Sequence, residues 1–206
     1  MRTKRRQFFS LRRHLVKIHR DLFTISDFVE RYEDEYVLSR FEMLVLILED
    51  RRFFNHGGFD MKATLREFLK KCAFMRHGGA STIDMQFVRT ATGFRKKTVS
   101  RKLYEMFLSF LIQYRYSKFQ ILRSYLAAAY FGSGITGANA ACRRTFNMPL
   151  NEISDQQAAE LASMLVYPRP KLPTPSWKAR IDRRASYGLI KLRKLEKKFD
   201  KLPKRG

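Results

Sequence analysis

An apolar run that ends in two acids is the feature that most constrains how this chain folds. The run Met43–Leu48 is apolar throughout, and Glu49 and Asp50 follow it directly. A packed segment therefore delivers two adjacent carboxylates to the point where it ends, and a carboxylate there can be half buried. Burial raises the pKa of a carboxyl group and prepares it to transfer a proton near neutral pH. Phe53 and Phe54 come next and supply an apolar wall.

Cationic and hydrogen-bonding groups accompany these acids. Arg51, Arg52 and His56 lie within the next few residues, and Gly57-Gly58 completes the stretch. This mixture suits a general acid or base, because a partly buried carboxyl group needs neighbours that fix its charge state. An acidic helix end before a glycine turn gives the same pattern. The stretch taken alone leaves both interpretations open.

The overall charge of the chain restricts the kind of partner it has. The 206 residues carry a formal net charge of +23, with 45% apolar and 14% aromatic residues. The apolar content excludes disorder by composition and is enough for one sizeable core, so we expect one domain, with at most a smaller lobe. The charge predicts a polyanionic partner, which is nucleic acid, an anionic membrane surface or a phosphorylated ligand. Charge alone does not choose among them.

The N-terminal segment is basic and amphipathic. Residues 1–20 hold many arginines and lysines, no acid, and interleaved apolar residues such as Phe8, Leu11 and Leu15. No apolar run approaches the roughly 18 to 20 residues that cross a bilayer, so we expect neither a transmembrane helix nor a signal peptide. Such a helix lies in the headgroup layer of an anionic membrane or remains a solvated basic tail, and the sequence leaves both open. The acidic residues 27–35 predict a further amphipathic helix.

A second glycine-rich turn interrupts the helical middle of the chain. The periodicity of Met61–Met75 predicts a helix that ends at Gly78-Gly79, and Ser81 or Thr82 is predicted to cap the next one. Free backbone N–H groups at such a helix start form a geometry that holds phosphate. The signal is weak alone, since many helices begin after a similar turn.

A basic cluster follows and surrounds an acid. Glu105 lies four residues after Arg101 and three after Lys102, so on a helix the acid and both cations share one face. This arrangement is either a surface ion-pair ladder or a cationic pocket with a carboxylate at its centre. The cluster also includes Arg89, Arg95, Lys96 and Lys97.

The last part of the chain is expected to be mostly scaffold. The glycines between Lys118 and Ala141 indicate a backbone that turns sharply or passes close to something. Glu152–Val166 is predicted to be a helix capped by Ser154. Tyr167–Pro175 holds four prolines and is predicted to be an extended strap, and Trp177–Phe199 a basic helix.

Four stretches, in order, resemble the signature motifs of the family 51 glycosyltransferases. These are the peptidoglycan glycosyltransferase domains of class A penicillin-binding proteins and their monofunctional relatives. The stretches are E-D-R-R-F-F-N-H-G-G-F-D from Glu49, G-G-A-S-T-I-D-M-Q-F-V-R from Gly78, R-K-L-Y-E from Arg101 and K-F-Q-I-L-R-S-Y-L-A-A-A-Y-F-G-S-G-I-T-G from Lys118. A further stretch, L-A-S-M-L-V-Y-P-R-P-K-L-P-T-P, resembles the closing motif. The resemblance covers roughly Phe41–Lys194.

The resemblance implies a fold and a reaction. The fold is mainly α, with a lysozyme-like large lobe and a small jaw lobe, and the predicted domains are a basic N-terminal segment with a lead-in helix (1–40), the glycosyltransferase domain (41–195) and a basic tail (196–206). The reaction joins the disaccharide of lipid II to a growing glycan, with inversion at the anomeric carbon and loss of undecaprenyl pyrophosphate. The expected partners are lipid II, or a similar undecaprenyl-pyrophosphate-linked sugar, and an anionic membrane surface.

The resemblance also assigns roles to residues. Glu49 matches the general base that deprotonates the 4-hydroxyl of the acceptor sugar, and Glu105 matches the second carboxylate, which assists the donor site. Arginine, lysine and hydroxyl groups are the residue types that neutralise a departing diphosphate. The residues expected to bind substrate or pyrophosphate are Asp50, Phe53, His56, Gly79, Ser81, Thr82, Gln86, Arg89, Arg101 and Lys102.

No cofactor is required by the sequence. A divalent cation, Mg²⁺ or Mn²⁺, could share the neutralisation of the diphosphate, although no carboxylate cluster looks dedicated to holding one, and we assign no metal ligands. The resemblance places the protein at the cytoplasmic membrane, by default on its outer face. Because no membrane-spanning segment is expected, delivery by another route or peripheral action on the inner face stays open.

The chain departs from the family pattern at three places. Asp84-Met85-Gln86 stands where the family usually has T-Q-Q, Arg89-Thr90 where it usually has Lys-Asn, and Ala127 where Asn is customary. Asp84 would repel a pyrophosphate if it pointed toward one. These departures, with the absent membrane anchor, keep open a relative that binds a lipid-linked intermediate without turnover. The net charge and the aromatic residues among the basic ones keep open a basic nucleic-acid-binding protein. Lysozyme-like cleavage is a further possibility, because one fold serves several chemistries.

Overall fold

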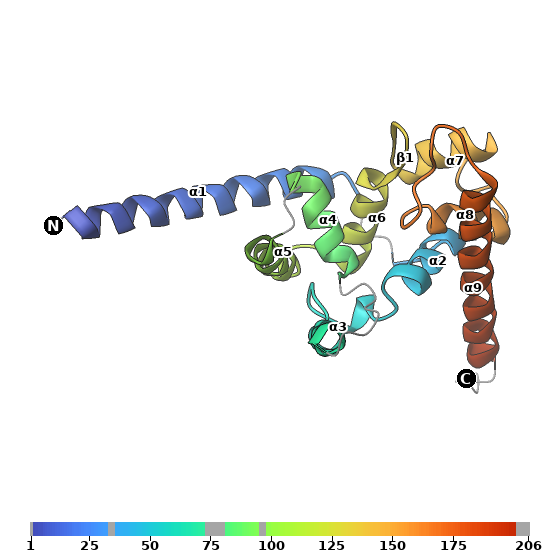
Figure 1. The fold of residues 1–206 in the computed structure, drawn as a ribbon, viewed down its shortest axis with the longest axis horizontal. Helices are drawn as coiled ribbons and strands as arrows, with labels where there is room; N and C mark the ends of the chain where they lie inside the picture. Colours follow the sequence, from blue (N-terminus) through green and yellow to red (C-terminus); the bar gives the residue numbers. More distant parts are fainter. Residues whose placement is uncertain (1, 33–35, 73–80, 95–97, 201–206) are drawn as a thin grey trace. The chain divides into compact units, whose positions relative to one another are not determined.

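The structure, a computed structural model, describes residues 2–32, 36–72, 81–94 and 98–200. Helices make up most of this part of the chain, and the strands within it form one small two-stranded sheet (Figure 1). The predicted mainly α class is therefore confirmed. The chain divides into two compact units, residues 1–35 with 56–125 and residues 36–55 with 126–206, and each is described by itself. The domain boundaries expected from the sequence stay a prediction.

The first unit is built on three helices that contact one another. These are α1 (Arg2–Val29), α4 (Ile83–Thr92) and α5 (Val99–Ile112) (Figure 1). Their buried faces carry large apolar side chains, and the ring of Phe28 on α1 meets the edge of Phe87 on α4 at 6.5 Å between centroids. The unit also holds α3 (Met61–Cys72) and most of α6 (Lys118–Ala128), whose last turn counts with the second unit.

Helix α1 confirms the predicted N-terminal helix but ends earlier than the acidic stretch suggested. After Val29 the chain leaves the helix through a turn in which the Tyr32 N–H donates to the Val29 carbonyl at 3.1 Å. The Tyr32 carbonyl then accepts from Nε2 of Gln120 at 3.1 Å. This long-range bond fixes the turn. Of the predicted helix over 27–35, residues 27–29 are helical as the end of α1, residues 30–32 form the turn, and residues 33–35 lie outside the described residues. Across the described residues, none of the helices combines the length and apolarity that crossing a bilayer requires.

The second unit packs three helices around a small core. Helix α2 (Arg40–Glu49) contacts both α8 (Asp155–Ser163) and α9 (Pro175–Asp200), and these two contact each other (Figure 1). Alanines on α8 are small enough to allow close approach to the leucine-rich helix α2. The predicted cap of α8 is confirmed, since Ser154 forms a capping box with Gln157. The remaining elements are η1 (Phe53–Asn55), β1 (Tyr130–Gly132), β2 (Ile135–Thr136) and α7 (Ala138–Phe146).

The glycine-rich segment after α6 forms a short antiparallel hairpin that the sequence did not identify as strands. Strands β1 and β2 pair Tyr130 with Thr136, and Gly132 also bridges to Arg169 in the proline-rich strap. A Cβ atom on Gly132 would lie 2.2 Å from the Arg169 carbonyl oxygen, and its φ is +144°. The expected close approach of the backbone is confirmed, and glycine is required there.

Candidate active site

Glu49 is the last residue of α2, and the fold of the second unit determines its position. Ser39 caps the helix start by accepting from the Glu42 N–H at 3.2 Å, while the Ser39 N–H donates to Glu42 Oε2 at 2.7 Å. The apolar side chains of Met43–Leu48 bury most of the helix, so its end lies at the edge of the core. The Glu49 side chain is only 9% exposed. The predicted half-buried acid at the end of a packed segment is what the structure shows.

Arg184 on α9 holds this carboxylate. Its Nη2 atom donates to Glu49 Oε1 at 2.7 Å and to the Leu48 carbonyl at 2.8 Å. The two bonds fix the guanidinium against the last turn of α2, where carbonyl groups lack helical partners and attract cations. The two bonds also hold the Glu49 carboxylate in one orientation beside Arg184.

The residues after Glu49 shape its surroundings within the second unit. Asp50 is buried and forms the C-cap of α2, with its N–H donating to the Leu46 carbonyl at 3.0 Å. Phe53 is fully buried, whereas Phe54 is half exposed and meets Phe53 edge to face at 5.3 Å. The predicted apolar wall therefore consists of Phe53, and Phe54 covers its outer edge.

Glu105 lies in the first unit and has no solvent-exposed surface. Arg89 on α4 binds it through two parallel hydrogen bonds, Nε to Oε1 at 3.1 Å and Nη2 to Oε2 at 3.0 Å. Arg101, one turn earlier on α5, places its Nε 3.1 Å from Oε1. Two guanidinium groups on one carboxylate leave an excess of positive charge. Glu105 thus lies at the centre of a buried cationic cluster and not in a surface ladder, and substrate binding by this cluster stays a prediction.

Three further predicted residues lie on or beside α4. Thr82 is the N-cap: its hydroxyl accepts from the Met85 N–H at 3.3 Å and donates to the Gly58 carbonyl at 2.7 Å. Ser81 Oγ lies 3.5 Å from Nη2 of Arg89. Gln86 accepts a hydrogen bond from the Tyr125 hydroxyl at 2.8 Å, which leaves its amide NH₂ as a donor. Both hydrogen bonds of the Thr82 hydroxyl therefore stabilise the fold. Ser81 lies beside Arg89, and Gln86 lies on the same helix as Arg89.

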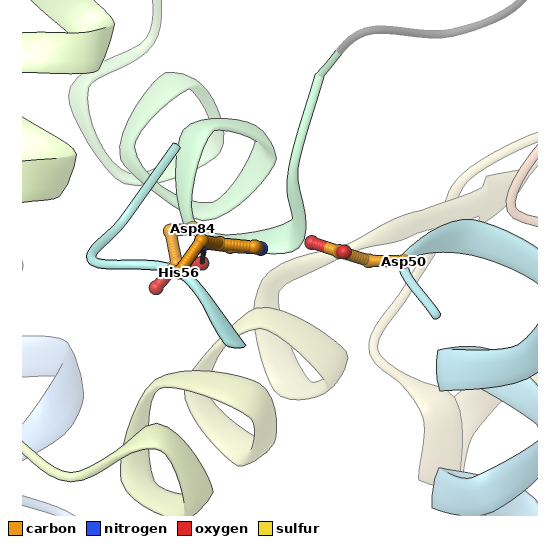
Figure 2. Close-up of side chains that lie close together, drawn as sticks. All are labelled: Asp50, His56 and Asp84. Carbon is orange, nitrogen blue, oxygen red and sulfur yellow. Dashed lines mark ion pairs between the residues drawn. The ribbon is translucent and has the colours of Figure 1, made fainter. Parts of the chain in front are cut away.

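Asp84 departs from the family pattern and would repel a pyrophosphate if it pointed toward one. In the structure its carboxylate pairs with Lys118 inside the first unit. It is fully buried, and Lys118 Nζ lies 3.1 Å and 3.0 Å from its two carboxylate oxygens. Gln113 Nε2 also donates to it, and His56 Nδ1 lies 3.9 Å away (Figure 2). The acid at this position therefore has a lysine partner in the fourth motif. A lysine on both oxygens also disfavours a divalent cation at Asp84.

Two predicted residues remain. Lys102 on α5 is half buried, and across the described residues it forms no ion pair. Gly79 lies outside the described residues, and so does the Gly78-Gly79 turn. Glu49 and Glu105 belong to different units, and the structure brings each of them to its own arginines.

Sequence reasoning missed Arg184 and Lys118. Arg184 is one of many cations on α9, and the preceding residue, Arg183, is exposed, so no local pattern distinguishes the two. Lys118 was visible as the first residue of the fourth motif. A buried acid at position 84 requires a partner. This requirement is the signal that could have linked Asp84 to Lys118.

Comparison with known proteins agrees with this geometry. A family model described as transglycosylase matches residues 30–192. Penicillin-binding protein 2a of Streptococcus pneumoniae is 39% identical over 140 residues, which is 68% of this chain and 19% of that protein. The biosynthetic peptidoglycan transglycosylase of Mannheimia succiniciproducens is 32% identical over 189 residues, covering 88% of this chain and 76% of the relative. The one from Nitrosomonas eutropha is 35% identical over 137 residues, covering 66% and 56%.

The chain belongs to the transglycosylase family, since the family model covers more than half of it. This finding confirms the resemblance that the four motifs indicated. The chain spans about a fifth of the length of penicillin-binding protein 2a and just over half of the Nitrosomonas relative.

Proposed function

We propose that this protein is a peptidoglycan glycosyltransferase that polymerises lipid II, or a similar undecaprenyl-pyrophosphate-linked sugar, into glycan strands. The observation that carries the proposal is Glu49, a mostly buried carboxylate at the end of α2 that Arg184 binds at 2.7 Å. Family membership supports it, and so do the names of relatives, which are called biosynthetic peptidoglycan transglycosylases.

Glu49 acts as the general base. It accepts the proton of the acceptor sugar's 4-hydroxyl as the oxygen attacks the anomeric carbon of the donor. One displacement at that carbon inverts its configuration, and the bond to the undecaprenyl pyrophosphate breaks as the new glycosidic bond forms. Arg184 keeps the carboxylate in place, because its second hydrogen bond anchors the guanidinium to the Leu48 carbonyl.

The departing diphosphate needs positive charge, and the first unit supplies it. Arg89 and Arg101 place two cations on one buried acid, Glu105, and Lys102 lies three residues before it on α5. Glu105 orients both guanidinium groups, so that their remaining N–H donors are fixed before the charge develops. Preorganised donors of this kind stabilise a developing anion without reorganisation during the reaction. Arg89 presents a planar fork where the family usually has lysine, so it replaces a point charge by a directional donor.

The site of action is the cytoplasmic membrane, because the substrate carries a long lipid. Helix α1 suits a peripheral attachment: arginines and lysines recur from Arg2 to Arg20, and Leu15, Val16 and Phe23 are exposed on it. An exposed apolar group beside cations favours the headgroup layer of an anionic bilayer.

Incubation of the purified protein with radiolabelled lipid II tests the proposal. We expect glycan strands and one undecaprenyl pyrophosphate released for each disaccharide added. Binding of lipid II without product would instead identify a relative that holds the lipid intermediate without turnover. A protein that neither binds lipid II nor makes glycan would contradict the proposal.

A further inference from the structure

A pocket of about 640 Å³ lies in the first unit where α1, the end of α4 and the start of α5 meet. Its volume is in the range of small-molecule sites. Of the residues assigned above to the reaction, only Arg101 lines it. The other residues used below are Lys17 from α1, Phe94 after α4, and Ser100 and Tyr104 from α5.

The polar part of this pocket is cationic. Lys17 Nζ binds Asp21 Oδ2 at 2.6 Å, and an ammonium group has three N–H donors, so donors remain for a second oxygen. Arg101 adds a guanidinium, and Ser100 adds a hydroxyl group on the first turn of α5. No carboxylate is among the described residues that line the pocket. The charge therefore favours an anionic group.

The rest of the pocket is aromatic. The rings of Phe94 and Tyr104 lie 5.5 Å apart at 49°, and Lys17 Nζ lies 4.6 Å and 3.9 Å from their centroids. The Tyr104 hydroxyl donates to Asp21 at 3.0 Å, and burial, with that hydrogen bond, raises the pKa of Tyr104 well above its ordinary value. The phenol therefore stays neutral and continues to donate its hydrogen bond to Asp21. The ring of Tyr104 is left as an apolar surface.

We propose that this pocket binds the phosphate headgroup of an acidic phospholipid, with the nearest carbons of the lipid against Phe94 and Tyr104. An aromatic wall beside cations suits an amphiphile better than free phosphate. The membrane is the source, because the part of α1 that lines the pocket, at His14 and Lys17, also carries exposed Arg12 and Leu15. The lipid would thus contact both α1 and the first turn of α5, where Arg101 lies four residues before Glu105. This inference goes beyond the proposed reaction and does not depend on it.

Calorimetric titration of the full chain with dihexanoylphosphatidylglycerol, below its micelle concentration, tests this inference. We expect saturable binding that is at least tenfold tighter than for dihexanoylphosphatidylcholine or inorganic phosphate. Equal affinity for the phosphatidylcholine would overturn the proposal, and so would equal affinity for inorganic phosphate, which would mean that the site holds an anion only.

Ser100→Glu is the decisive variant. It places an acid in the pocket and should weaken binding of the phosphatidylglycerol at least tenfold. Ser100 is exposed and is the second residue of α5, where an acid favours the helix, so the variant should fold. Asn139→Glu is the matched control, because Asn139 is exposed at the same position of α7 in the other unit. Unchanged affinity in Ser100→Glu would refute the site, and Lys17→Gln serves if Ser100→Glu does not fold.

The outcome is separable from that of the proposed reaction. Glu49→Gln should stop glycan synthesis and leave binding of the phosphatidylglycerol unchanged, since Glu49 belongs to the other unit. A protein that binds this lipid but makes no glycan would defeat the proposed reaction alone. One that makes glycan but does not distinguish the two lipids would defeat only the present inference.

Discussion

Arg184 binds Glu49 in one unit, and Arg89 and Arg101 bind Glu105 in the other. At the scale of single residues, each acid is thus held by guanidinium groups and largely shielded from water. Such contacts restrict the orientation of the carboxylate. The arginines are therefore as much a part of the proposed chemistry as the acids.

Removal of Arg184 should slow the reaction without weakening substrate binding. In Arg184→Met, Glu49 loses the group that orients it, and we expect kcat for glycan synthesis to fall at least roughly tenfold with KM nearly unchanged. Arg183→Met, at the exposed neighbouring position, is the control and should retain full activity. A loss in KM alone would show that Arg184 binds substrate and does not position the base.

The buried pair Asp84 and Lys118 should behave as a unit in stability. Lys118→Met leaves a fully buried carboxylate without its lysine and should lower the free energy of unfolding by roughly 3 to 5 kcal/mol. Adding Asp84→Asn to that variant should recover most of the loss. Urea unfolding of both single variants and the double variant measures the coupling, and additive effects would show that the pair does not interact.

Two adjacent glycines should respond differently to alanine. A Cβ atom on Gly58 would lie 2.2 Å from the Ser109 carbonyl oxygen, and φ is +88°, whereas one on Gly57 meets nothing within 4 Å. Gly58→Ala should therefore destabilise the protein by about 2 to 4 kcal/mol, and Gly57→Ala by much less. Equal urea midpoints for the two variants would contradict the close approach of Gly58 to α5.

At the scale of elements, α2 is the helix whose sequence most directly determines the position of a site residue, Glu49. Its apolar run packs on α8 and α9, and this packing determines where Glu49 emerges. The run, the acids and the cap of α8 could be predicted, because periodicity and capping residues are local signals. The short hairpin over β1 and β2 could not, because its pairing depends on the distant strap at Arg169.

The capping box of α2 gives a test at this scale. Ser39→Ala removes the hydroxyl that accepts the Glu42 N–H, and we expect a loss of about 1 kcal/mol in the free energy of unfolding. Ser186→Ala, at an exposed position within α9, is the control and should change stability little. If the two variants had equal stability, the cap of α2 would not contribute to the fold.

At the scale of the whole molecule, the four motifs are divided between two units. The first motif supplies Glu49 to the second unit, while the second and third supply Arg89, Arg101 and Glu105 to the first. The sequence indicated these acids and cations through motif spacing, whereas Arg184 comes from a helix that carries many cations. Tertiary packing, and not local pattern, selects it. The family model that matches residues 30–192 places the chain in the transglycosylase family.

The rate of lipid II polymerisation by Glu49→Gln tests the central claim most directly. Glutamine keeps the shape of the side chain but accepts no proton, so we predict that glycan synthesis falls at least roughly hundredfold while the protein remains folded. Glu152→Gln, at an exposed acid in the same unit, should retain the activity of the unaltered protein. A Glu49→Gln protein that polymerises lipid II as fast as the Glu152→Gln control would contradict the account.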